Sequence, residues 1–154
     1  MLTKDQAFDL MKKTLAFSKA DECEINLTGS QNGNVRYARN SVSTSGIISQ
    51  NSLVVSSAFG KKLGVATINE FDDASLEKVV RRSEELANLA PENPEYVPFL
   101  GPQTYAESKT FVPATAAITP KQRTDMVEQS LAVAKNSKTV AAGFLEDSTG
   151  FAAM

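Results

Sequence analysis

The sequence contains no histidine, no tryptophan and only one cysteine, and these shortages exclude several kinds of chemistry. Without histidine, the commonest general base and a principal zinc ligand are missing. The single cysteine, Cys23, excludes an internal disulfide and is in keeping with a reducing compartment. Cys23 lies between Glu22 and Glu24, whose negative charges disfavour a thiolate. We therefore interpret it as a small buried side chain at the start of a strand.

Two further absences concern membranes and nucleic acids. No apolar run approaches the ~20 residues that a membrane-spanning helix needs, and the N-terminus lacks the apolar core of a signal peptide. The formal net charge is −2, and the 16 basic and 18 acidic residues are spread along the chain. No basic block is therefore available to bind nucleic acid. We expect a cytoplasmic protein that binds neither a membrane nor nucleic acid.

The composition that remains, 42% hydrophobic and 22% charged residues, is typical of a globular protein. Residues 4–19 predict a helix that follows a capping box at Thr3, with an apolar stripe of Phe8, Met11 and Leu15 that Ala7, Leu10 and Ala16 widen. Residues 72–90 predict a second helix, which is capped by Asp72 and ends before Pro91.

Between these helices the sequence is β-prone. Residues 23–27 and 34–38 predict two short strands, and the turn residues 28–33, which include Asn32-Gly33, predict a hairpin between them. A second turn is expected at 39–41. Residues 46–59 predict the longest strand, which turns back at 60–62 into a strand at 63–68. Gly64 inside that returning strand indicates the close approach of another backbone.

Beyond the second helix the character of the sequence changes. Residues 91–118 contain five prolines and spaced aromatic residues, which predicts an extended connector that lies on a surface. A capping box at Thr119 then predicts a helix to about residue 135, and residues 140–145 predict a strand. The apolar face of that helix is expected to carry Met126, Val127, Leu131 and Ala134.

The predicted fold class is α+β: an antiparallel sheet of hairpins packed against two helices, then a proline-rich connector and the start of a second α+β domain. We divide the chain into an N-terminal domain at 1–90, the connector at 91–118 and an incomplete second domain at 119–154. One helix and one strand cannot bury their apolar faces alone, so we expect the chain to be a piece of a longer protein.

Three stretches carry a resemblance to a known family. They are residues 35–42 (VRYARNSV), residues 59–67 (FGKKLGVAT) and the helix that contains Leu76, Val80 and Leu86-Ala87. Their order and spacing resemble the N-terminal part of TldD/PmbA proteins, a family of proposed modulators of DNA gyrase and zinc-dependent proteases. The resemblance covers residues 4–105, and more loosely 119–150.

The resemblance implies peptide hydrolysis by a full-length protein that holds zinc through an HExxxH helix further along a longer chain. Because this chain has no histidine, no catalytic and no metal-binding residue can be transferred onto it. The chain is then a non-catalytic N-terminal domain, without a cofactor of its own, of a zinc-containing hydrolase. The family pattern also implies a dimer with itself or with a paralogue, and unfolded peptide as substrate.

Two alternatives remain open. Some family members lack the HExxxH motif, so the chain could be a dimerisation or interaction module of a non-catalytic regulatory partner of the gyrase-modulator type. It could also be complete as it stands, as a small α+β binding domain.

The polar alternation of the longest strand suggests one candidate site. Its residues Ser49, Asn51, Ser52 and Ser56 could form a strand edge that pairs with a substrate peptide or with a partner. The alternative is an ordinary strand that faces solvent.

Overall fold

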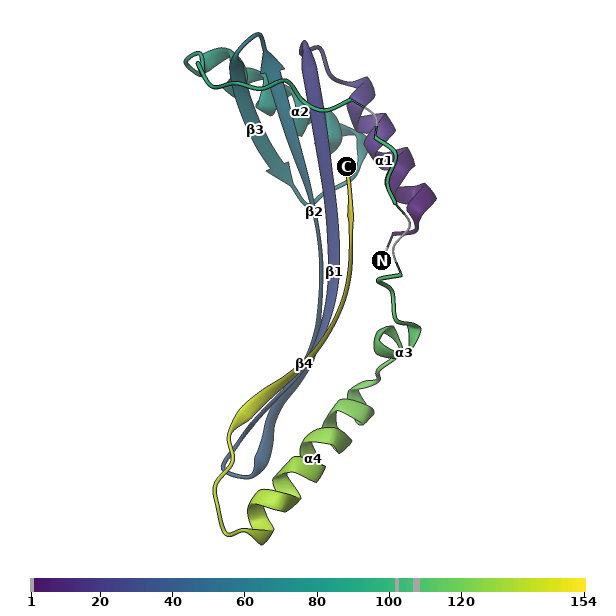
Figure 1. The fold of residues 1–154 in the computed structure, drawn as a ribbon, viewed down its shortest axis with the longest axis vertical. Coiled ribbons are helices and arrows are strands. Elements are labelled where there is room, and N and C mark those ends of the chain that lie inside the picture. Colours follow the sequence, from purple (N-terminus) through teal and green to yellow (C-terminus); the bar gives the residue numbers. More distant parts are fainter. Residues whose placement is uncertain (1, 102, 107–108) are drawn as a thin grey trace. The chain divides into compact units, whose positions relative to one another are not determined.

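The computed structural model describes residues 2–101, 103–106 and 109–154. In these residues the helices are α1 (Lys4–Ala16), α2 (Asp73–Leu89), α3 (Pro113–Ala116) and α4 (Pro120–Asn136). The strands are β1 (Glu22–Ala38), β2 (Ser41–Phe59), β3 (Lys62–Ile68) and β4 (Gly143–Ala153) (Figure 1). The strands form one antiparallel sheet in the order β3-β2-β1-β4, which confirms the predicted α+β class.

Contacts between residues group the chain into two compact units. The first, which we call the α1–α2 unit, comprises residues 1–29, 50–106 and 151–154. The second, the α4 unit, comprises residues 30–49 and 107–150. Strands β1, β2 and β4 contribute residues to both units. The sequence-based division at residues 90 and 118 concerns domains and stays a prediction.

The α1–α2 unit is built on a core of aliphatic side chains from the sheet and both helices. Its fully buried members are Leu27, Leu53, Val55, Leu76 and Val80. The alternation predicted for residues 23–27 is confirmed, because Ile25 and Leu27 are both buried.

Helix α1 has the predicted capping box, in which Thr3 and Gln6 bond each other's backbone. Its buried face consists of Ala7, Met11 and Thr14, of which Ala7 and Met11 belong to the predicted stripe. Phe8 is 40% exposed, and Lys4 Nζ lies 5.8 Å from the centre of its ring. The prediction was wrong for Phe8 and Leu15, because the helix packs through a narrow face that includes the small Ala7.

Helix α2 begins as predicted, with the Asp72 side chain accepting from the Ser75 amide. It packs closely on β3, because a Cβ added to Gly64 would lie 2.2 Å from both the Ala87 nitrogen and the Ser83 oxygen. The close backbone approach predicted for Gly64 is therefore confirmed. A buried hydrogen bond of 2.7 Å between the hydroxyls of Ser57 and Ser83 also joins β2 to this helix.

Strand β1 runs unbroken through the residues that were predicted to form a hairpin turn at 28–33. That prediction was wrong, because the glycines there make room for neighbouring side chains. A Cβ on Gly29 would lie 2.3 Å from both Asn51 Oδ1 and the Phe151 ring. A Cβ on Gly33 would collide with the Arg123 guanidinium.

The hairpin turn of the sheet lies at Arg39-Asn40, as predicted for residues 39–41. Both residues have positive φ angles, 52° and 58°, which is typical of a two-residue type I′ turn. Strand β2 therefore begins at Ser41, and the predicted start at residue 46 was too late. Asn40 also holds the loop before β4, because its side chain accepts from the Ala141 amide at 2.7 Å and donates to the Thr139 carbonyl at 2.8 Å.

In the α4 unit, helix α4 covers one face of β1, β2 and β4. Its Val127 and Leu131 pack on buried Val35, with Tyr37, Val42 and Leu145 around them. The predicted capping box at Thr119 is confirmed. The predicted apolar face was partly wrong, since Met126 is 46% exposed whereas Arg123 is buried. Strand β4 begins at Gly143, three residues later than predicted, and continues to Ala153.

The first part of the proline-rich segment, residues 91–101, lies on the α1–α2 unit. The Asn93 amide donates to the Lys61 carbonyl at 2.9 Å, and the Phe99 amide donates to the Glu22 carboxylate at 2.7 Å. These contacts agree with the expectation that the segment follows a surface. The short helix α3 in its last part was not predicted.

Among the described residues, no helix is both long enough and apolar enough to cross a membrane.

Glu84 joins α2 to the segment that follows α1. Its Oε1 accepts from the Lys19 amide at 2.5 Å, and its Oε2 accepts from Arg81 Nη1 at 2.7 Å. Burial is the largest single influence on the pKa of Glu84 and raises it, but the Lys19 and Arg81 bonds together outweigh burial and lower the pKa. The folded state therefore favours the ionised carboxylate.

Replacing Gly64 by alanine is expected to destabilise the protein by about 1–3 kcal/mol, because the added Cβ must displace helix backbone. The free energy of unfolding in urea measures the loss. Gly46→Ala is the matched control, since a Cβ there meets nothing within 4 Å. Equal stability of the two variants would contradict the packing described for β3 and α2.

Glu84→Gln is expected to destabilise the protein by about 1–3 kcal/mol at pH 7, because bonds to an ionised group are lost. The pKa of Glu84 in the folded state lies below its value in the unfolded chain, which is about 4.3. The stabilisation by Glu84 is therefore fully present at pH values above the unfolded pKa. It is lost as the pH falls through the folded-state pKa. Urea midpoints of both proteins should therefore converge between about pH 6 and pH 3. Glu85→Gln, which removes the exposed pair with Arg82, should change the midpoint little at any pH.

Candidate functional site

The four candidate residues on β2 lie in different environments. Ser49 is exposed, whereas Asn51, Ser52 and Ser56 are half-buried. Strand β3 pairs with β2 from Leu53 to Phe59, and Ser56 lies opposite Val65. Because β1 is the other neighbour of β2, Ser56 lies inside the paired part of the sheet and not at an edge. Ser49, Asn51 and Ser52 precede the residues that pair with β3, and their role stays a prediction.

The part of β2 that belongs to the α4 unit forms what we call the open edge, residues Ser41–Ser49. Every residue from Ser43 to Ser49 is exposed. The exposed fractions of Ile47 and Ile48 are 51% and 58%, although adjacent residues of a strand point to opposite faces. Neither face of the sheet is therefore covered at this point by the residues that the structure describes.

The serine hydroxyls of the open edge turn inward, toward β1. Ser43 Oγ donates to the Arg36 carbonyl at 3.1 Å, and Ser45 Oγ donates to the Asn34 carbonyl at 3.2 Å. Ser49 Oγ accepts from the Gln31 side chain at 3.3 Å. These small side chains do not obstruct the outer side of the strand.

The hairpin turn determines which main-chain groups point outward. In a two-residue type I′ hairpin the two flanking residues, here Ala38 and Ser41, form a hydrogen-bonded pair, and this pattern repeats at every second residue. The bonds of Ser43 and Ser45 to opposite residues of β1 fit this register. Thr44 and Gly46 therefore direct their main-chain groups away from β1, toward the outer side of the open edge.

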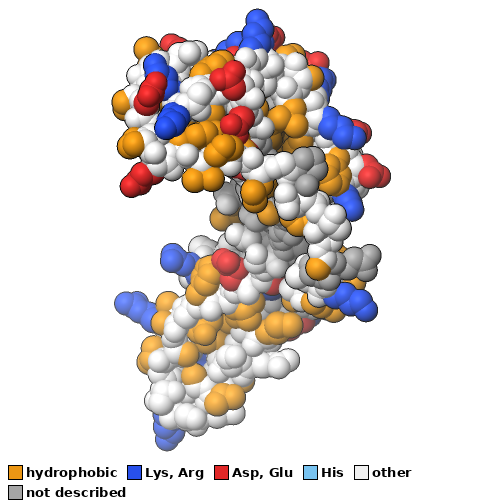
Figure 2. All heavy atoms as spheres, turned by 45° about the horizontal axis from the view of Figure 1, so that its top comes forward, with side chains coloured by type: hydrophobic (Ala, Val, Ile, Leu, Met, Phe, Trp, Pro, Cys, Tyr) orange, Lys and Arg blue, Asp and Glu red, His pale blue; other side chains and the backbone are white. Residues whose placement is uncertain are grey.

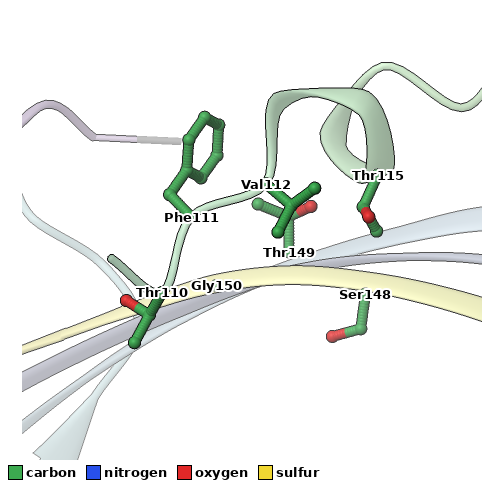
Figure 3. A pocket seen from close by; sticks show the side chains of 7 residues that line it. All are labelled: Thr110, Phe111, Val112, Thr115, Ser148, Thr149 and Gly150. Carbon is green, nitrogen blue, oxygen red and sulfur yellow. The ribbon is translucent and has the colours of Figure 1, made fainter. Parts of the chain in front are cut away.

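A pocket of about 220 Å³ lies elsewhere in the α4 unit (Figure 3). Its lining alternates hydroxyl and apolar groups and comprises Thr110, Phe111, Val112, Thr115, Ser148, Thr149 and Gly150. Figure 3 shows Thr149 pointing toward Val112, while Ser148 points to the other side of β4. The lining offers serine and threonine hydroxyls but no carboxylate, amine or thiol, so no lining side chain could act as the general base that activates a hydroxyl.

The most buried charged group of the α4 unit is Arg123, of which 3% is exposed. Its Nε and Nη2 both donate to the Asp147 carboxylate, and Nη2 also donates to the Ile118 carbonyl at 3.2 Å. The guanidinium lies on Gly33 of β1, where any larger residue would collide with it. Sequence reasoning missed this contact, although Arg123 shares its helix face with Val127 and Leu131 at a spacing of four residues.

The structure adds two observations on chemistry. Within residues 2–101, 103–106 and 109–154, no three His, Cys, Asp or Glu side chains form a group that could hold a metal ion. Burial raises the pKa of the Cys23 thiol more than the bonds to Ser18 and Ser57 lower it. A raised pKa disfavours the reactive thiolate.

Charges of both signs lie on the visible face of the α1–α2 unit in Figure 2. On the face at the top of Figure 2, acidic and basic side chains are interspersed and form no patch of one sign. This distribution agrees with the net charge of −2.

Comparison with known proteins identifies the family. Residues 23–87, which run from the start of β1 almost to the end of α2, match the family model PmbA/TldA metallopeptidase domain 1. The chain belongs to the TldD/PmbA family. The predicted resemblance is thereby confirmed.

Solved structures share the fold of almost the whole chain. TldE from Thermococcus kodakarensis is 18% identical, with a TM-score of 0.75 over 96% of this chain and 34% of that one. A proposed modulator of DNA gyrase from Bacteroides thetaiotaomicron is 17% identical, with a TM-score of 0.76 over 99% of this chain and 36% of that one. A third structure, a proposed modulator of a DNA gyrase from Thermotoga maritima, is 14% identical, with a TM-score of 0.67 over 95% and 38%.

The chain thus spans only about a third of the length of these TldD/PmbA-like structures. At such identities the likeness shows the fold and not the activity. A search of curated proteins finds no match.

Replacing Asp147 by asparagine is expected to destabilise the protein by about 3–5 kcal/mol, because the buried Arg123 guanidinium loses its counter-charge. The free energy of unfolding in urea measures this loss. Lys121→Met is the control, since it removes the pair of Lys121 with Asp125, in which the lysine side chain is 82% exposed. That change should cost about 0–1 kcal/mol. Similar losses in both variants would contradict the role assigned to the Arg123–Asp147 pair.

Proposed function

We propose that this chain is the non-catalytic N-terminal domain of a TldD/PmbA-type zinc metallopeptidase. The observation that carries the proposal is the match of residues 23–87 to domain 1 of a metallopeptidase family. The fold of TldE supports it, because nearly the whole of this chain superimposes on a third of that longer protein. The activity proposed for the full-length protein is peptide hydrolysis in the cytoplasm.

The residues of this chain do not fit a zinc ion. The sequence has no histidine, so it cannot supply the HExxxH helix of the family. Its less exposed carboxylates already have protein partners: Asp147 binds Arg123, Glu84 binds Arg81 and Lys19, and Glu22 binds the Phe99 amide. We therefore derive no catalytic step within these 154 residues.

The proposed contribution of the chain is structural, through the close packing within each unit. The Gly64 contact fixes α2 on β3, and the buried Arg123–Asp147 pair fixes α4 on β1 and β4. Such a framework can form part of the wall along which an unfolded peptide reaches a catalytic domain. In that domain the zinc ion would activate a water molecule for amide hydrolysis.

A second candidate function is a dimerisation or interaction module of a non-catalytic regulatory partner. The open edge favours it, because an uncovered strand edge is a surface suited to pairing. Two of the similar structures are proposed gyrase modulators, which agrees with a regulatory role. The partner would be a second copy or a TldD/PmbA paralogue.

Zinc content distinguishes the two candidates. We expect elemental mass spectrometry to find no stoichiometric zinc in the 154-residue chain, and about one zinc per chain in the protein expressed from its natural gene. The reason is that zinc needs a ligand set that these residues lack. The peptidase assignment also predicts that the natural gene encodes an HExxxH motif.

Two results would contradict the first proposal. Stoichiometric zinc in the 154-residue chain would place the metal site within it. A zinc-free natural protein without the motif would support the regulatory candidate instead.

A further inference from the structure

We propose that Asn32-Gly33 is a conditional modification site: the folded α4 unit protects this pair from deamidation, and opening of the unit exposes it. The pair has the composition of a turn but lies within β1, and neither proposed function uses it. The inference concerns the lifetime of the folded unit, and it does not depend on whether the full-length protein binds zinc.

The reaction is intrinsic to an asparagine that precedes a glycine. The Gly33 nitrogen attacks Cγ of the Asn32 side chain, loses its proton and forms a new C–N bond, while the side-chain nitrogen leaves as ammonia. Water then opens the five-membered imide at either carbonyl, which yields aspartate or isoaspartate at position 32. Glycine is the most permissive following residue, because it has no Cβ to hinder its nitrogen. The pair is therefore reactive wherever the main chain can bend into the ring.

The first protection is conformational. Ring closure requires rotation about the bond between Cα and the carbonyl carbon of Asn32, away from the extended ψ angle of about 135°. Strand β1 is unbroken across this position. In the hairpin register the even-numbered residues of β1 direct their main-chain groups toward β2, so the main-chain groups of Gly33 face β4, the other neighbour of β1. The nitrogen that has to attack is thus held within the sheet.

The second protection is packing against β4 and α4. Gly29 lies against the Phe151 ring, and Gly33 lies against the Arg123 guanidinium, which binds Asp147. The equal steps from 29 to 33 and from 151 to 147 indicate that Gly33 lies opposite Asp147 in an antiparallel pair. Gly33 is buried. Its rotation toward the preceding side chain would therefore require the contact with the guanidinium to break.

The third protection concerns the side chain of Asn32. Adjacent residues of a strand point to opposite faces, so this side chain lies on the face opposite Arg123. Its Oδ1 is buried and accepts no hydrogen bond from the residues that the structure describes. Negative charge develops on this oxygen when Cγ is attacked, and a buried oxygen without a donor does not stabilise that charge. The folded environment therefore raises the barrier to ring closure.

Modification would also prevent the unit from forming again. Isoaspartate carries the main chain through Cβ and adds a methylene group to β1, which shifts the residues on its two sides relative to each other. Gly29 and Gly33 could then no longer both meet their partners, Phe151 and Arg123. The aspartate product would bring a charge to an oxygen that is buried without a donor. Each opening of the unit thus carries a risk of permanent loss.

The test is the rate of deamidation of Asn32 in the 154-residue chain, followed by peptide mass spectrometry after tryptic cleavage under mildly acidic conditions. The reference is a synthetic peptide of residues 28–37 with blocked ends, which cannot form the sheet. We expect the folded chain to react at least about a hundredfold more slowly than the peptide, because only the open fraction of molecules reacts. Addition of urea should raise the rate in proportion to the unfolded fraction, until it approaches the rate of the peptide.

Asp147→Asn links the reaction to the α4 unit. It removes the counter-charge of buried Arg123, so the rate at Asn32 should rise about a hundredfold or more, up to the rate of the peptide. Lys121→Met is the matched control, since it removes an exposed ion pair of the same helix. Its rate should stay within about threefold of the wild type. The urea series gives the same information from the wild type alone.

Three results would overturn the proposal. They are a folded chain that reacts within about threefold of the peptide, an Asp147→Asn variant that reacts at the rate of the wild type, and a chain with isoaspartate at position 32 that keeps the wild-type free energy of unfolding. None of these results bears on the zinc measurement, so failure of this inference is distinguishable from failure of the peptidase assignment.

Discussion

Both compact units depend on the unbroken course of β1. The strand continues through residues 28–33, whose composition favours a turn. The glycines of this stretch instead make room for side chains: Asn51 and Phe151 lie against Gly29, and Arg123 lies against Gly33. At Gly33 the group that comes close is the guanidinium of Arg123, which is buried and paired with Asp147. A buried charge pair is strongly destabilised when either partner is lost. Since a larger residue at position 33 would displace the guanidinium, the docking of α4 on β1 depends on this glycine.

Much of the fold was predictable because its signals are local. Thr3, Asp72 and Thr119 cap their helices through side chains that bond backbone only a few residues away. The positive φ angles at Arg39 and Asn40 belong to a turn that closes within two residues. Features of this kind depend on short-range sequence, and the order of helices and strands follows from them.

The errors occurred where a distant contact decides the structure. Asn32-Gly33 has the composition of a hairpin turn, but Arg123, 90 positions later in the chain, requires a glycine in an extended strand. Ala7 and Phe8 were both predicted on the apolar stripe of α1, but Ala7 is buried whereas the larger Phe8 is 40% exposed. The candidate residues on β2 lie in two different environments, again because of pairing with a segment that is distant from some of them in the sequence. Ser56 and Ser49 look alike in sequence, and only the length of β3 shows that one is paired on both sides and the other is not.

The functional inference also has two parts, one that follows from the sequence and one that needs the register of the folded sheet. Family membership follows from residues 23–87, which carry the domain 1 pattern of a metallopeptidase family. The chemistry proposed for the full-length protein needs metal ligands, and these 154 residues contain no histidine to supply them. What the chain offers is a main-chain surface: an uncharged strand whose hydroxyls are used internally and whose amides at Thr44 and Gly46 point outward. Main-chain pairing needs no particular side chain at the contact. A pairing role of this kind would therefore leave little trace as a sequence motif, and it becomes visible only when the register of the sheet is known.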